Sequence, residues 1–460
     1  MKRNIISLLS AIVMLTTISS CCNDSGYGYK MKDGMIVYNT PERPADQKSV
    51  IGLTAAPMET VRIGIIGLGM RGPSAVDRFT YIEGADIVAI CDLYPEKLAP
   101  VQDLLERRGK ARAAEYSGED GWKEMCLRDD VDLVYIVTPW LTHTPMAVFA
   151  MEHGKHVAVE VPAATSVEEC WQLVNTAEKT QRHCMMLENC VYDFFELTTL
   201  NMAQEGLFGE VIHAEGAYIH NLDPYWAEYQ DNWRLLYNRK HRGDVYATHG
   251  MGPACQVLNI HRGDKMNLLV SMDTDAFNGK KVAEHFTGSS EYANGDHTTT
   301  LIRTEKGKTI EMQHNVVTPR PYNRMYQVEG TEGFANKYPN EGFALRTKGL
   351  DGESYVSDEI RNAIMVEYQH PITREGTLVE TAKRVGGHGG MDFIMDYRLI
   401  YCLRNGLPLD QDVYDAAEWS CIGELSRVSI ENGSMPVVMP DFTRGDWNRT
   451  DGLRLALKKH

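Results

Sequence analysis

Residues 61–72 read VRIGIIGLGMRG, an apolar run of strand length that leads directly into the spacing Gly-x-Gly-x-x-Gly. In a dinucleotide-binding turn one such glycine permits the tight bend, one lets the backbone approach a pyrophosphate, and one lets the next helix pack on the strand. We expect that helix over residues 71–80, with the phosphates at its N-terminus, where free N–H groups point outward. The motif supplies five predicted cofactor contacts: Gly67, Gly69, Met70, Arg71 and Gly72.

A second strand is predicted by ADIVAICD, residues 85–92, which ends on Asp92, 20 residues after the last glycine. A carboxylate in this place binds the ribose hydroxyls of the adenosine and repels a 2′-phosphate. No Arg or Lys follows Asp92 directly, so NAD is favoured over NADP. The alternative, a glycine turn that binds no nucleotide, leaves this strand and its terminal carboxylate unexplained.

The same alternation continues to residue 189. Helices are predicted over 96–110, 143–155 and 166–181 (the last capped by Ser166), and strands over 131–139, 156–162 and 184–189. Alternating strands and helices form a doubly wound parallel sheet, and ligands bind at the carboxyl ends of its strands. That rule adds seven predicted cofactor contacts: Trp140, Leu141, Thr142, His143, Glu160, Val161 and Asn189.

After residue 205 the pattern changes. Residues 210–220 alternate like a strand with one wet face, and residues 297–316 read as a hairpin that turns at Lys306-Gly307. The fold class is therefore α/β: a Rossmann domain over residues 59–190, then an α+β domain over 191–460. We expect that second domain to hold an open, mostly antiparallel sheet, and the amphipathic segment 389–406 to pack back on the first domain.

The first 58 residues carry targeting signals. Residues 1–20 place Lys2 and Arg3 before an apolar run, which is typical of a secretory signal peptide. The run ends Ile-Ser-Ser-Cys at Cys21, which resembles a bacterial lipobox and implies lipidation of Cys21; an ordinary cleaved signal peptide is the alternative. Residues 21–58 show no sustained apolar period and are predicted to be a tether. We expect a lipid-anchored protein of the bacterial cell envelope, with the membrane as partner only through that anchor.

The net charge and the cysteine spacing limit which partners and which kinds of site are expected. The net charge of −16 becomes −18 once Lys2 and Arg3 leave with the signal peptide, and such a surface repels phosphate backbones. Nucleic acid is not an expected partner. Apart from Cys21 and Cys22, the cysteines are scattered singly without CxxC spacing, so we predict neither a disulfide framework nor a metal site. A homo-oligomer is expected.

These features resemble the glucose–fructose oxidoreductase and inositol dehydrogenase superfamily, and within it glycoside hydrolase family 109, the NAD-dependent α-N-acetylgalactosaminidases. The resemblance runs from about Ile51 to near the C-terminus. The stretches that carry it are GLGMRGP, AICD, VTPW, VEVP, LENCVYD, GAYIH, NWRL, HGMGP and TPRPYNR.

Four departures from related motifs matter. Most members of the superfamily have Glu-Lys-Pro where this chain has Glu160-Val161-Pro162, and an Asp and a His where it has Tyr246 and His249; both differences match family 109. Within that family, Tyr-Pro-Thr-His is usual where this chain has residues 246–249, reading Tyr-Ala-Thr-His. Trp-Glu-Trp-His is usual where residues 140–143 read Trp-Leu-Thr-His, which leaves the substrate preference open.

The resemblance implies a glycosidase that works through oxidation. NAD⁺ takes a hydride from carbon 3 of the sugar, a base removes the acidified carbon 2 proton, the carbon 1 substituent leaves, water adds, and the hydride returns. The implied substrate is a glycan with terminal N-acetylgalactosamine. The implied catalytic residues are His249, Tyr246 and Tyr192, and the implied substrate contacts are Tyr218, Arg234, Tyr246, His249 and Tyr322.

Other interpretations of these residues stay open at this point. A lone histidine such as His249 is more often a core residue, and Arg234 with the tyrosines could be a surface arginine and half-buried rings. His388 and Asp392 are interpreted as capping and packing the late helix. The alternative functions are a net NAD-dependent sugar or polyol dehydrogenase, which Val161 disfavours, and a non-catalytic sugar-binding lipoprotein.

Overall fold

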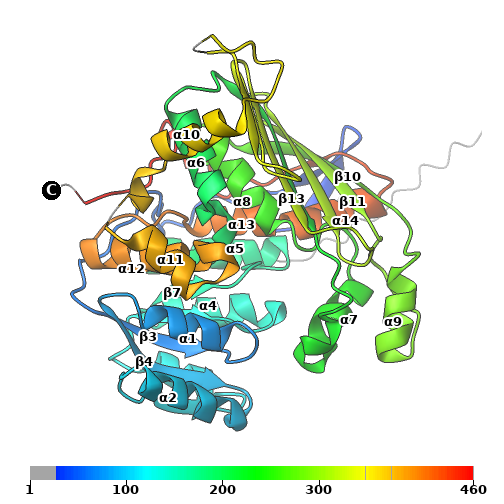
Figure 1. Cartoon of the computed structure of the whole chain (residues 1–460). Helices are drawn as coiled ribbons and strands as arrows, with labels where there is room; N and C mark the ends of the chain where they lie inside the picture. Colours follow the sequence, from blue (N-terminus) through cyan, green and yellow to red (C-terminus); the bar gives the residue numbers. More distant parts are fainter. Residues whose placement is uncertain (1–26, 348, 375, 459–460) are drawn as a thin grey trace, which may run out of the picture.

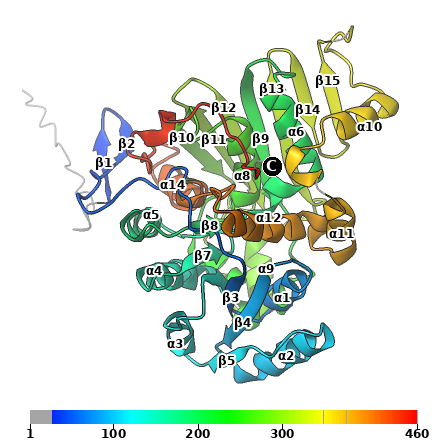
Figure 2. The ribbon, with the colours of Figure 1, turned by 90° about the vertical axis from the view of Figure 1, so that its left-hand side faces the viewer.

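The computed structural model describes residues 27–347, 349–374 and 376–458 (Figures 1 and 2). The predicted signal peptide and Cys21 lie outside these residues. Two sheets organise the chain, one in each domain (Figure 1). Among the described residues, no helix has the length and apolar character needed to cross a bilayer.

The first domain holds a six-stranded sheet in the order β5-β4-β3-β6-β7-β8, with every neighbouring pair parallel. This is the strand order of a dinucleotide-binding fold, and it confirms the predicted Rossmann domain. The strands are β3 (Val61–Ile66), β4 (Ala85–Asp92), β5 (Ala114–Ser117), β6 (Leu133–Ile136), β7 (His156–Val159) and β8 (Cys184–Met186). The helices are α1 (Gly72–Phe79), α2 (Leu98–Arg107), α3 (Gly121–Cys126), α4 (His143–Glu152) and α5 (Val167–Thr180).

Local sequence explains these elements well. The central strands β6 and β7 are buried at every position, because helices cover both faces of the sheet. Ser166 caps α5 as predicted, with its side chain accepting a hydrogen bond from the N–H of Glu169.

The second domain holds a ten-stranded sheet in the order β1-β2-β16-β10-β11-β12-β9-β13-β14-β15. Only the pairs β12–β9 and β16–β2 are parallel, so the predicted mostly antiparallel sheet is confirmed. Its main strands are β9 (Val211–Ile219), β10 (Met266–Asp273), β11 (Thr298–Thr304), β12 (Thr309–Asn315), β13 (Asn323–Gly330), β14 (Gly333–Asn336), β15 (Gly342–Leu345) and β16 (Val437–Val438). The helices are α6 (Phe194–Gln204), α7 (Trp233–Lys240), α8 (Thr248–Val257), α9 (Gly279–Thr287), α10 (Asp358–Glu367), α11 (Leu378–Val385), α12 (Met391–Asn405), α13 (Val413–Ser420) and α14 (Ile422–Glu431).

The prediction of a tether over residues 21–58 is wrong for its later part. Residues 29–38 form β1 (Tyr29–Lys32) and β2 (Met35–Tyr38), and β2 pairs with β16 at one edge of the large sheet, opposite β15 (Figure 2). Ile36 is fully buried there. The partner strand β16 follows β2 by about 400 residues in the sequence. The short alternation of β2 therefore does not indicate that this segment pairs into the large sheet.

Helix α12 joins the domains, as the segment 389–406 predicted. Its Asp396 accepts hydrogen bonds from Arg78 Nε at 2.7 Å and from the Tyr135 hydroxyl at 2.9 Å, both within the first domain. All three side chains are buried, and a buried carboxylate needs such partners to offset its lost hydration. The helix is thereby held on the first domain, and its C-terminal Arg404 donates to the carbonyls of Glu59 and Glu83, just before β3 and β4.

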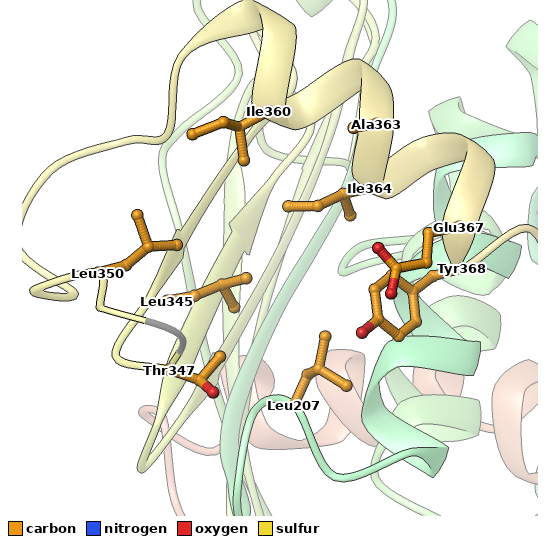
Figure 3. A pocket seen from close by; sticks show the side chains of 9 residues that line it. All are labelled: Leu207, Leu345, Thr347, Leu350, Ile360, Ala363, Ile364, Glu367 and Tyr368. Atoms are coloured by element: carbon orange, nitrogen blue, oxygen red, sulfur yellow. The ribbon is translucent and has the colours of Figure 1, made fainter.

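An apolar pocket of about 230 Å³ lies under α10 at the β15 edge of the large sheet (Figure 3). Leucine and isoleucine side chains line most of it, with Glu367 and Tyr368 at one end. None of the predicted site residues lines this pocket.

Candidate functional site

The glycine turn after β3 fits the NAD that the sequence predicts. A Cβ on Gly67 would lie 2.6 Å from the carbonyl oxygen of Val137, and one on Gly72 would collide with the carbonyl of Gly67. At Gly69, by contrast, nothing lies within 4 Å of the position a Cβ would take. Two glycines are thus required by packing, while the middle one leaves open space where a pyrophosphate can approach the backbone.

Asp92 ends β4 beside this turn. Its carboxylate accepts hydrogen bonds from the N–H groups of Leu68, at 2.6 Å, and Tyr94, at 2.9 Å. These bonds fix the carboxylate at the carboxyl edge of the sheet, where a ribose can donate to its remaining lone pairs.

We expect Asp92→Ala to weaken NAD binding by about 1–3 kcal/mol, the contribution of hydrogen bonds to a charged group. Calorimetric titration of the stripped protein with NAD⁺ measures this change. Asp92→Asn is the matched control, because it keeps the shape and one oxygen for the Leu68 N–H but removes the charge and the acceptor for the Tyr94 N–H. Unchanged affinity in both variants would mean that this carboxylate does not face the ribose.

Arg71, from the glycine turn, reaches a cluster of charged groups. Its Nε lies 3.5 Å from Glu160 Oε1, and its Nη2 lies 3.3 Å from Asp392 Oδ2. Asp392 also accepts from Asn189 Nδ2 at 2.6 Å. Burial raises the pKa of Asp392, but the hydrogen bond from His388 and the charges of Arg71 and Arg78 outweigh burial and hold it well below its usual value. Predicted cofactor contacts from three strand ends thus meet around one ionised carboxylate.

His388 completes this cluster, and the sequence interpretation missed it. Its Nδ1 lies 3.0 Å from Asp392 Oδ2, while the side chain as a whole is 48% exposed. Asp392 therefore orients the ring and leaves Nε2 free toward solvent. The surrounding sequence Gly-Gly-His-Gly-Gly (386–390) was the available signal, because positive φ at all four glycines presents the histidine on an irregular turn.

His249 forms a second histidine–carboxylate pair. It lies in the first turn of α8, and its Nδ1 is 2.9 Å from both oxygens of Glu188 at the end of β8. Burial raises the pKa of Glu188, but the charge and hydrogen bond of His249 outweigh it, so Glu188 stays ionised. The His249 side chain is 13% exposed and Glu188 is fully buried, so the carboxylate orients the ring from behind. His249 is not a core histidine.

Aromatic rings surround His249. The centroid of its ring lies 5.0 Å from that of Tyr246 and 5.5 Å from that of Tyr218. Trp140 stacks on Tyr246 at 5.2 Å, and the Arg234 guanidinium lies 4.5 Å from the Tyr246 centroid. The structure therefore brings together four predicted substrate contacts and one predicted cofactor contact, from β9, α7, the turn after β6 and the start of α8 with the residues before it.

Arg234 is buried rather than a surface arginine. Its Nη1 donates to the Tyr229 hydroxyl at 2.7 Å, but its Nη2 has no hydrogen-bond partner among the described residues. A buried donor without a partner is rare and costly, and a bound polar ligand would satisfy it.

The side chains of Tyr192 and His143 turn into the core and do not reach this cluster. Tyr192 is fully buried, and its hydroxyl lies 3.3 Å from Asp410 Oδ2 in the core. Burial raises the pKa of Tyr192 well above its usual value, so the structure does not favour it as a base. His143 is also fully buried, with its ring nitrogens against the carbonyls of Pro162 and Thr138, and it holds two strand ends together. Leu141 is 60% exposed beside Trp140.

Three potential metal ligands meet at His249. One atom each from Glu188, Cys190 and His249 lie within 4.8 Å of one another, although their sequence spacing resembles no known motif. Glu188 already accepts from the Cys190 N–H and from His249, and Arg324 Nη1 lies 3.0 Å from the Cys190 sulfur. A guanidinium there opposes a cation, so we interpret the group as a hydrogen-bonded support for His249.

Asp244, two residues before Tyr246, gives the site loop a pH dependence. It is fully buried, and neither carboxyl oxygen has a hydrogen-bond partner of normal geometry. Burial raises its pKa to about 7, and the nearby backbone of Tyr246 offsets this only in part. The pKa of this carboxyl is about 4 in the unfolded chain, so between pH 4 and about 7 the folded chain holds the proton and the unfolded chain releases it. The free energy of unfolding therefore decreases as the pH rises through this range.

We therefore expect Asp244→Asn to raise the melting temperature at pH 8 and to leave it nearly unchanged at pH 4. Thermal unfolding followed by circular dichroism at both pH values measures the difference. A shift of the same size at both values would contradict this account of Asp244.

Two family models match the chain. The model described as "Glycosyl hydrolase 109, C-terminal domain" matches residues 192–449, and "Oxidoreductase family, NAD-binding Rossmann fold" matches residues 61–188. Glycosyl hydrolase family 109 protein 1 of Bacteroides thetaiotaomicron is 58% identical over 470 aligned residues, covering 99% of both chains. A family 109 protein of Porphyromonas gingivalis is 61% identical over 436 residues, covering 92% of this chain and 93% of its own.

Solved structures share the fold. A levoglucosan dehydrogenase in complex with NADH has a TM-score of 0.63 at 17% identity, covering 83% of this chain and all of its own. An aldose-aldose oxidoreductase of Caulobacter crescentus, complexed with glycerol, has a TM-score of 0.61 at 18% identity, with the same coverage. These structures show the shared fold, and the matching NAD-binding Rossmann model makes NAD the cofactor of the first domain.

Proposed function

This chain belongs to glycosyl hydrolase family 109, and from that premise we propose that it removes terminal N-acetylgalactosamine from glycans through oxidation at carbon 3 and elimination across carbons 1 and 2. The family and the NAD-binding fold make it an NAD-dependent glycoside hydrolase. The sugar and the route are our proposal. The observation that carries it is the pair of oriented histidines, His249 on Glu188 and His388 on Asp392.

The residues of the first domain fit a bound NAD molecule. Gly69 and the N-terminus of α1 would hold the pyrophosphate, and Asp92 would hold the adenosine ribose. When bound, NAD⁺ supplies a reversible hydride acceptor for carbon 3, so that hydrolysis consumes no cofactor. All proton transfers are left to the side chains of the protein.

His249 is suited to accept a proton at the carbon 2–carbon 3 edge of the sugar. Glu188 holds its Nδ1 and stabilises the imidazolium that forms, which leaves Nε2 as the accepting atom. Tyr246 is suited to the opposite task, because burial raises its pKa well above the usual value and keeps the phenol protonated. Tyr246 then donates a hydrogen bond to a sugar oxygen, and the unpaired Nη2 of Arg234 donates a second.

His388 is suited to donate a proton to the leaving group. It is more exposed than His249, and it comes from the α12 side of the site. Adjacent residues link the two histidine–carboxylate pairs, because Glu188 holds His249 while the next residue, Asn189, donates to the Asp392 that holds His388. We assign His388 the proton given to the oxygen on carbon 1, which makes the departing alcohol neutral.

One assay separates the candidate functions. The purified protein is incubated with a nitrophenyl N-acetylgalactosaminide and without added NAD⁺. Release of nitrophenol with no net NADH supports the proposal, because a recycled cofactor stays bound. Accumulation of NADH on free sugar would instead favour the sugar or polyol dehydrogenase, and neither signal would favour a non-catalytic sugar-binding protein.

We also propose that the enzyme is anchored to the cell envelope through Cys21, which lies outside the described residues. The support is the signal-like sequence that precedes it. Labelling cells with a radioactive fatty acid should mark the wild-type chain and leave Cys21→Ser unmarked.

A further inference from the structure

We infer that Tyr225 and Tyr322, with His220 between them, form a second sugar subsite that binds the glycan unit next to the terminal sugar. This inference rests on the proposed function and adds the aglycone, an oligosaccharide, to it. Family resemblance implied a substrate contact for Tyr322 alone, while Tyr225 and His220 were assigned no role.

The three rings continue directly from the reacting cluster. Tyr218, which packs against Tyr246 and His249, lies with its hydroxyl 3.0 Å from His220 Nδ1. From His220, the ring centroids of Tyr225 and Tyr322 lie at 5.4 Å and 5.0 Å. Each step of about 5 Å corresponds to about one pyranose ring.

Exposure rises along the same path. Tyr218 is 5% exposed and Tyr246 8%, whereas Tyr225 is 40% exposed and Tyr322 is 42% exposed. The inner rings are enclosed as a site for a single terminal sugar requires, and the outer rings face solvent as a continuing glycan requires. Exposed aromatic rings beside a buried polar site offer flat apolar faces to the C–H groups of a sugar.

Both tyrosines are held in place before any ligand binds. Tyr225 is followed by the fully buried Trp226, and its N–H donates to the carbonyl of Leu222 at 2.8 Å. The same loop is tied to the first domain, where the Tyr94 hydroxyl donates to Asp231 Oδ2 at 2.9 Å. Tyr322 follows Pro319 and Pro321, which restrict its backbone. A backbone restrained in this way lowers the conformational entropy that is lost when a sugar orders the two rings.

His220 and Tyr322 carry no charge at neutral pH. Burial is the main cause that lowers the pKa of His220 to about 4, so its imidazole is neutral, and burial raises the pKa of Tyr322 well above its usual value. An uncharged aromatic surface suits neutral hexoses or N-acetylhexosamines better than sialic acids or sulfated sugars, which would leave a charge without a partner. The favoured occupant is therefore a neutral sugar.

The test compares two substrates that differ only beyond the glycosidic oxygen. One is the methyl glycoside of N-acetylgalactosamine, and the other is the disaccharide of the same anomer with galactose as the second unit. We expect Tyr225→Ala to lower kcat/KM for the disaccharide about five- to tenfold, mostly through KM, with no change for the methyl glycoside. Tyr225→Phe keeps the ring and should behave as wild type on both substrates.

Tyr355→Ala is the matched control, because Tyr355 is 57% exposed and packs on Phe334 of β14 and beside Gly342 of β15, at the edge of the large sheet. It should change neither substrate. Equal effects of Tyr225→Ala on both substrates, or no effect on either, would overturn the subsite while the proposed function stands. If wild type cleaves neither substrate, the proposed function itself fails.

Discussion

His249→Ala should lower the rate of glycoside hydrolysis by about 10²–10⁴-fold, the usual contribution of a positioned acid or base. The structure gives the reason. Nδ1 of His249 is held by the buried Glu188, so Nε2 is the atom that meets the sugar. Steady-state rates with a nitrophenyl glycoside measure the loss.

Further measurements on His249→Ala and a second variant, Glu188→Gln, separate proton transfer from folding and from positioning. The NAD content of His249→Ala should match wild type, because the ring contacts no predicted cofactor residue directly, whereas its melting temperature should fall, because the buried carboxylate of Glu188 loses its ionic partner. Glu188→Gln should keep the ring in place but remove the charge that stabilises the imidazolium, so kcat should fall and the acid limb of the pH–rate profile should move. Full activity of His249→Ala would return this histidine to a packing role.

His388→Ala should also lower the rate of glycoside hydrolysis by about 10²–10⁴-fold, but only for substrates whose leaving group needs a proton. A methyl glycoside expels a strongly basic alkoxide unless an acid protonates it, whereas nitrophenolate leaves without help. We therefore expect the large loss with the methyl glycoside and a much smaller one with the nitrophenyl glycoside. Rates of both substrates in wild type and variant give the comparison.

Asp392 supplies a control for this assignment. Asp392→Asn keeps the shape of the support but removes the negative charge that His388 and Arg71 share, so it should repeat the substrate pattern of His388→Ala more weakly. If His388→Ala lowered both substrates equally, His388 would act at another step, such as cofactor or sugar binding.

Local signals predicted the frame of the site. The glycine turn, Asp92 and the Ser166 cap each depend on a few neighbouring residues, and the structure places all three as expected. The alternation of strand and helix then fixed the parallel sheet, since right-handed crossovers leave few other arrangements.

Side-chain pairs between residues far apart in the sequence could not be predicted from such local signals. Glu188 and His249 are 61 residues apart, and Arg71 and Asp392 are 321 apart, so only the packed domains bring each pair together. His388 was passed over for the same reason: its partner Asp392 resembled a helix cap until Asn189 and Arg71 were found on it. Tyr192 was predicted as a site residue from its spacing after Asn189. That spacing does not reveal that its ring turns into the core toward Asp410.

The most direct test of the oxidation–elimination route is solvent deuterium at carbon 2 of the released sugar. Hydrolysis in D₂O, followed by mass spectrometry and NMR of the free N-acetylgalactosamine, reports whether the carbon 2 proton left during turnover. The account predicts deuterium at that carbon, and no deuterium at carbon 3, because the hydride returns to the carbon from which it came. Product that carries its original proton at carbon 2 would contradict the elimination route, whatever the activity of the His249 variants.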